Sequence, residues 1–142
     1  MAAEPRVEGP GARVLVLSFS DLARDPRVHR QLRFLAPLHR VTAAGWADPQ
    51  VGGVRFVPLA PRPKPLPRKL LAAARLLAGR FDAYTWNRSE VLDCRARLAG
   101  IEADVVVAND IDALPVALAL FPRARVLFDA HEYAPLEFED RL

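Results

Sequence analysis

The feature that most constrains the fold is an almost entirely apolar segment at residues 14–19, VLVLSF, which is rich in side chains that favour β-structure. Strands with one solvated face alternate apolar and polar residues, whereas strands of a parallel sheet are covered on both faces and read as continuous apolar runs. The segment is therefore expected to form a central strand of a parallel sheet.

Shorter apolar segments recur along the chain and alternate with segments of helical periodicity. They predict strands at residues 41–46, 54–59, 105–108 and 125–128. Helices are expected at residues 26–38, 69–80, 88–99 and 113–121, and the proline-rich stretch 60–69 is expected to be an extended connector. This alternation predicts an α/β fold with a single Rossmann-like, doubly wound parallel sheet and helices on both faces, and right-handed crossovers favour the strand order 3-2-1-4-5.

Length and composition suit one soluble domain. The 142 residues are 51% hydrophobic and 26% charged, and no apolar run reaches the roughly 20 residues of a membrane span. Residues 1–12 show no periodicity and are expected to be a flexible leader to a domain at 13–142. A single cysteine, Cys94, and the lack of a secretion signal predict a cytoplasmic protein. The net charge of +3 is too small to indicate nucleic-acid binding.

Polar residues follow three of the predicted strands directly. In the order 3-2-1-4-5 the first, fourth and fifth strands are neighbours, and ligands bind such sheets at the carboxyl ends of the strands where the order reverses. The loops at 18–25, 108–112 and 129–132 should therefore meet at one edge. Their candidate site residues are Ser20, Asp25, Asp110, Asp112, Asp129, His131 and Glu132.

These residues also allow other interpretations. Asp25 and Asp112 each precede a helical pattern and are expected to cap it. The carboxylates and His131 are possible metal ligands by type, but their spacing matches no metal-binding motif. GxGxxG and GxxxxGK[ST] are both absent, which argues against a dinucleotide site and a phosphate-binding loop. Cys94 lies within a predicted helix and is interpreted as a packing residue.

The predicted helix that ends near residue 80 has an apolar face flanked by basic side chains. This pattern is typical of a helix packed on the sheet with a solvated basic edge, which we prefer, but also of a helix lying on an anionic membrane. Peripheral contact with the inner face of the membrane therefore remains an alternative. The basic residues are Arg68, Lys69, Arg75 and Arg80.

Three segments together resemble a known family. They are DPRVHRQLRFLAPLHRVT (25–42), VVVANDIDALPVALAL (105–120) and RVLFDAHEYAP (125–135). They resemble the N-terminal domain of glycosyltransferases with the two-domain GT-B architecture, in particular family 4 and its relatives. In that family a strand ending in Asn/His-Asp leads to a helix opening D-x-L-P, and the next strand runs into D-x-H-E.

The resemblance implies retaining transfer of a sugar from a nucleotide-sugar donor to an acceptor hydroxyl, without a cofactor or an obligatory metal. The N-terminal domain of such enzymes holds the acceptor, and the variable stretch 47–80 would belong to the acceptor site. A second, C-terminal domain with an E-x7-E signature binds the donor. The 142 residues contain no such domain. We therefore expect the chain to act with a C-terminal domain in cis or in trans and to be inactive alone.

The resemblance also suggests roles for individual residues. His131 matches the family histidine that faces the reacting sugar, and Asp110 matches a carboxylate that orients the acceptor or His131. Asp129 and Glu132 would organise the loop and contact substrate. Two alternatives remain open: a nucleotide-sugar epimerase of the same fold, and a non-catalytic module that binds a sugar or a partner protein.

Overall fold

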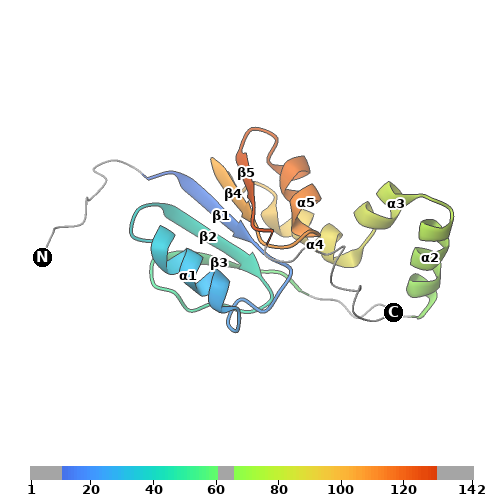
Figure 1. Cartoon of the computed structure of the whole chain (residues 1–142), viewed down its shortest axis with the longest axis horizontal. Helices are drawn as coiled ribbons and strands as arrows, with labels where there is room; N and C mark the ends of the chain where they lie inside the picture. The colour runs from blue at the N-terminus through green and yellow to red at the C-terminus, as the bar shows by residue number, and fades with distance from the viewer. Residues whose placement is uncertain (1–10, 61–65, 131–142) are drawn as a thin grey trace, which may run out of the picture.

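The computed structural model describes residues 11–60 and 66–130, and its strands form one parallel sheet. The order is β3-β2-β1-β4-β5, as predicted, and each neighbouring pair is parallel (Figure 1). The two strands nearest the C-terminus match their predicted bounds. The strands are β1 Arg13–Leu17, β2 Arg40–Gly45, β3 Val54–Pro58, β4 Val105–Ala108 and β5 Arg125–Phe128.

The main differences between the predicted and observed helices concern α1, α2 and α3. α1 ends at Leu35 and not near residue 38, because Pro37 has no N–H to continue the helix. α2 begins at Leu66, so the end of the predicted connector is helical; Pro67 is tolerated because it lies in the first turn. α3 was not predicted. The bounds are α1 Pro26–Leu35, α2 Leu66–Leu77, α3 Phe81–Trp86, α4 Ser89–Leu98 and α5 Ala113–Leu120.

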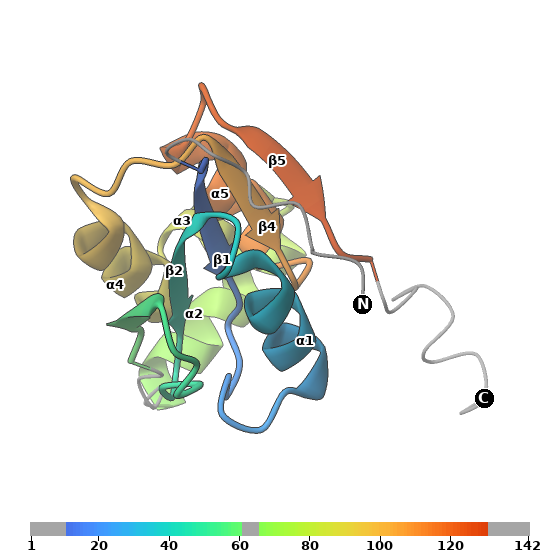
Figure 2. The same cartoon turned by 90° about the vertical axis from the view of Figure 1, so that its left-hand side faces the viewer.

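Two apolar clusters cover the two faces of the sheet, as the continuous apolar pattern of β1 requires. Successive residues of a strand point to opposite faces. Val14 and Val16 pack with α1 on one face, whereas Leu15 and Leu17 pack with α4 and α5 on the other. Figure 2 shows α1 and α4 on opposite sides of the sheet.

Helices α2 and α3 lie beside this core and not on it. α2 packs mainly against α3, so the expectation that it packs on the sheet is wrong. No residue of α2 or α3 whose side chain is described is buried. The two helices project beyond the end of the sheet toward which the strands run (Figure 1). α2 ends at Leu77, two residues before Gly79, whose φ of 67° is in the region that favours glycine.

Candidate functional site

The loop between β1 and α1 is held across the carboxyl end of β2. The backbone N–H of Trp46 donates to the carbonyl of Ser20 at 2.9 Å. Leu22 is fully buried over Gly45, where an added Cβ would lie 2.4 Å from the Leu22 Cγ. Gly45 thus allows the close approach that brings Ser20 to the edge of the sheet.

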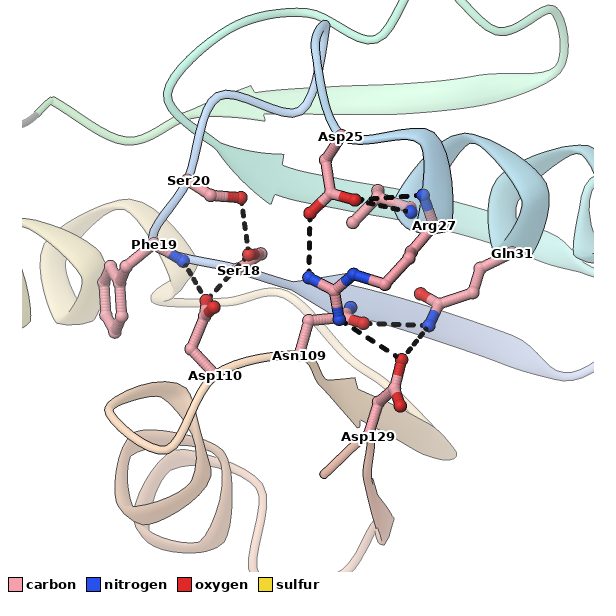
Figure 3. A network of polar contacts seen from close by, with 10 residues as sticks. Ser18, Phe19, Ser20, Asp25, Arg27, Gln31, Asn109, Asp110 and Asp129 are labelled. Atoms are coloured by element: carbon pink, nitrogen blue, oxygen red, sulfur yellow. Dashed lines mark hydrogen bonds and ion pairs between the residues drawn. The ribbon is translucent and has the colours of Figure 1, made fainter. Parts of the chain in front are cut away.

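Asp110 joins the end of β4 to this loop, as Figure 3 shows. Its Oδ2 accepts hydrogen bonds from the Ser18 hydroxyl and from the Phe19 backbone N–H, both at 2.7 Å. The Ser18 and Ser20 hydroxyl oxygens are 2.7 Å apart. β1 ends at Leu17, earlier than predicted, so Ser18 and Phe19 can turn toward Asp110. The structure therefore brings together Ser20 and Asp110, as predicted.

Asp129, at the end of β5, lies against α1. Its backbone N–H donates to the carbonyl of Ala108, which continues the pairing with β4. Its Oδ2 accepts a hydrogen bond from the Gln31 side-chain amide at 2.9 Å and lies 3.7 Å from Nη1 of Arg27. Arg27 also pairs with Asp25 at 3.0 Å, so its guanidinium lies between two of the predicted site carboxylates (Figure 3).

Asn109 and Gln31 extend this polar cluster into the interior. The Gln31 amide also donates to Oδ1 of Asn109 at 2.8 Å, and Asn109 is completely buried. Nδ2 of Asn109 and Oε1 of Gln31 are buried and have no hydrogen-bond partner among the described residues. Such atoms cost roughly 1–3 kcal/mol each when they stay unsatisfied. They leave one donor and one acceptor for water or for a ligand hydroxyl.

Sequence reasoning did not select Arg27, Gln31 or Asn109 as site residues. One signal was present, because Arg27 and Gln31 are four residues apart and share a face of the predicted helix. Nothing in the sequence indicated that this face meets Asp129. Asn109 directly precedes Asp110, but the prediction treated it only as part of the strand exit.

The two predicted helix caps have different outcomes. Asp25 caps α1, because its side chain accepts hydrogen bonds from the N–H groups of Arg27 and Val28. Asp112 does not cap α5, and the cap prediction is wrong there. The N–H groups of Ala113 and Leu114 donate instead to the backbone carbonyl of Asp110, which is already close enough to close the first turn.

The side chain of Asp112 binds Arg88, at the start of α4. Two nitrogens of the guanidinium lie 2.6 and 3.2 Å from the carboxylate, and a third lies 2.9 Å from Glu90. The hydrogen bond to Asp112 is the main cause of the raised pKa of Arg88. Asp112 therefore does not join the cluster that Asp110 forms with Ser18 and Ser20, which corrects its place among the predicted site residues.

A cavity of about 260 Å³ lies between α2, α3 and α4. Its wall mixes apolar side chains with the two cations Arg75 and Arg88. Arg88 connects it to Asp112, two residues beyond Asp110. The lining residues are Leu71, Ala72, Arg75, Tyr84, Asn87, Arg88, Ser89 and Leu92.

Two predicted site residues, His131 and Glu132, lie outside the described residues. Within residues 11–60 and 66–130, no three or more His, Cys, Asp or Glu side chains are grouped so that they could hold a metal ion. Cys94 is buried, and burial raises the pKa of its thiol to about 12. The thiol is therefore protonated at neutral pH, which agrees with its interpretation as a packing residue.

The fold and the site alone define the class of this protein, because the comparisons with known proteins found no match. No protein-family model matches the chain, and no match was found among curated proteins or solved structures. The class is a Rossmann-like α/β domain in which polar side chains meet at the carboxyl edge of the sheet. In the described part of the chain, no helix has the length and apolar character needed to cross a bilayer.

Proposed function

We propose that the chain is the acceptor-side half of a retaining glycosyltransferase. The observation that carries the proposal is the meeting of Asp110 and Asp129 with the β1–α1 loop and α1 at one edge of the sheet. That edge lies beside β1, where the strand order reverses, and open α/β sheets bind their ligands there. The same residues belong to the segments that resemble GT-B enzymes.

The geometry of Asp110 supports an orienting role. Two short hydrogen bonds fix its Oδ2, whereas its Oδ1 accepts none from the described residues. A fixed carboxylate with one open oxygen can accept a hydrogen bond from an acceptor hydroxyl and hold it at a set angle. His131, two residues after Asp129, then contacts the reacting sugar or polarises the acceptor.

The donor nucleotide is bound by a C-terminal domain supplied in cis or in trans, without a cofactor or an obligatory metal. In the transfer, the bond between the anomeric carbon and the diphosphate breaks, and a bond to the acceptor oxygen forms. The diphosphate leaves with the bonding electrons, and its oxygen takes up the proton that the acceptor hydroxyl loses. The cavity between α2, α3 and α4 supports an acceptor of mixed polarity, because its wall is partly apolar and partly cationic.

The test is an activity assay of the chain fused to, or mixed with, a GT-B donor-binding domain. We expect acceptor-dependent release of nucleoside diphosphate from one nucleotide sugar in a panel, with a glycosylated product of the expected mass. His131→Ala should lower kcat by at least about a hundredfold, the usual contribution of a positioned acid or base. The matched control is His39→Ala, which changes a histidine next to the amino end of β2.

Three results would contradict the proposal. Full activity of the His131→Ala variant would remove the assigned role of that residue. Release of nucleotide and an altered sugar without any acceptor would identify an epimerase. Specific binding of a sugar with no turnover in any fusion would identify a non-catalytic module.

A further inference from the structure

One face of α2 is apolar and exposed. Leu66, Leu70, Ala73 and Leu77 follow one another at intervals of four, three and four residues, which places them on one side of the helix. Leu66, Leu70 and Leu77 are 67%, 63% and 91% exposed. We call these four residues the outer face of α2.

The outer face is not the side by which α2 meets the rest of the molecule. Leu71, Ala72 and Arg75 line the cavity shared with α3 and α4, and they lie on the opposite side of the helix. The exposed fractions of the leucines show that no described element covers the outer face. A row of exposed leucines of this kind marks a surface that binds a partner.

The stretch of sequence that contains α2 carries basic residues and no acidic ones. Residues 49–81 contain no Asp or Glu, whereas the whole chain carries only +3, so the remaining residues are acidic on balance. Lys69 and Arg80 are exposed, and neither forms an ion pair with a described residue. The basic residues of the segment are Arg55, Arg62, Lys64, Arg68, Lys69, Arg75 and Arg80.

We propose that α2 docks on the surface of an anionic phospholipid bilayer, with its outer face among the acyl chains and Lys69 and Arg80 at the headgroups. A helix with apolar and basic sides binds membranes in this way. The outer face consists of Leu and Ala and lacks the Trp, Tyr and Arg side chains that dominate protein interfaces. This docking is independent of the proposed sugar transfer.

The first test is sedimentation of the full chain with vesicles. We expect it to bind vesicles with about one-third anionic phospholipid, to bind neutral vesicles weakly, and to be released by salt. The double variants Lys69→Glu/Arg80→Glu and Leu70→Ser/Leu77→Ser should each lower the partition coefficient by at least about tenfold. The matched controls, at exposed residues outside α2 and α3, are Arg33→Glu/Arg123→Glu and Phe34→Ser/Leu118→Ser.

The second test reports which surface touches the lipid. Because Cys94 is buried and its thiol pKa is about 12, a cysteine introduced by Leu77→Cys can be labelled selectively with a polarity-sensitive fluorophore. Its emission should shift to the blue on anionic vesicles. The same label on Leu118→Cys, in α5, should not shift.

The proposal is overturned by any of three results. One is wild-type sedimentation that is absent, or equal on neutral and anionic vesicles. Another is equal emission shifts at the two labelled positions. The third is a dimer in solution that Leu70→Ser/Leu77→Ser converts to a monomer, which would make a second copy the occupant of the outer face. Circular dichroism of every variant separates these results from loss of folding.

Discussion

Helices α1 and α2 are similar in sequence pattern and different in environment. They contain 10 and 12 residues, and each has an apolar side. α1 buries Val28 and Leu32 completely against the sheet, whereas α2 buries none of its described side chains. The difference teaches that periodicity defines an apolar face but does not say what covers it.

The largest expected effect compares the same substitution in the two helices. Leu32→Ala should lower the free energy of unfolding by about 2–5 kcal/mol, because it leaves a cavity in the cluster between α1 and the sheet. Leu77→Ala should change it by less than about 0.5 kcal/mol, because Leu77 is 91% exposed. Urea unfolding measures both. Equal losses would mean that α2 belongs to the packed core.

The next effect compares the starts of α1 and α5. Asp25→Ala should cost about 1 kcal/mol of unfolding free energy, because two backbone N–H groups lose their acceptor. Asp112→Ala should cost no more than about 1 kcal/mol, because it removes a partly exposed ion pair and no cap. Combining each variant with Arg88→Met distinguishes the two causes. The Arg88 change should cost less in the Asp112→Ala background, where only its contact with Glu90 is left to lose, than in the Asp25→Ala background, where it should have its full effect.

The smallest effect concerns the amino edge of the sheet, far from α2. Arg13 pairs with Asp104 there and with Glu102, and hydrogen bonds from Arg13 lower the pKa of Asp104 to about 2. A carboxylate whose pKa is lower in the folded than in the unfolded state stabilises the fold at pH values above its unfolded-state pKa. This contribution is lost as the pH falls toward the folded-state pKa of about 2. The stability difference between wild type and Asp104→Asn should therefore be constant above about pH 5 and shrink between about pH 4 and 2.

Chemical unfolding at several pH values checks this prediction. Glu102→Gln is the control, because Glu102 is the more exposed partner of Arg13. A difference that grows as the pH falls would contradict the assignment of the pair.

The sequence predicted the sheet more completely than it predicted the helices. Strand order followed from the apolar pattern, because parallel strands are buried on both faces and crossovers have one hand. α3 was not predicted, because a helix of 6 residues is too short to show the periodic spacing of apolar residues that identifies a helix. α2 starts inside the proline-rich stretch because proline is tolerated in a first turn, which composition alone does not reveal.

The candidate site was predictable in position and less so in its contacts. Ser20, Asp110 and Asp129 lie at the expected edge because each is within three residues of the carboxyl end of a strand. Arg27 and Gln31 could not be selected, since about a hundred residues separate them from the carboxylate that they contact. His131 and Glu132 remain predictions, to be tested by the assay of sugar transfer.

By itself the sequence determined the class of fold, the strand order and the edge at which polar residues gather, because local patterns encode burial and period. Only the tertiary structure decided which carboxylate meets which cation. It pairs Asp112 with Arg88 and sets Arg27 between Asp25 and Asp129. The physical reason is that a hydrogen bond forms only when its donor and acceptor lie within about 3.5 Å of each other. Packing sets that distance for segments that are far apart in the chain.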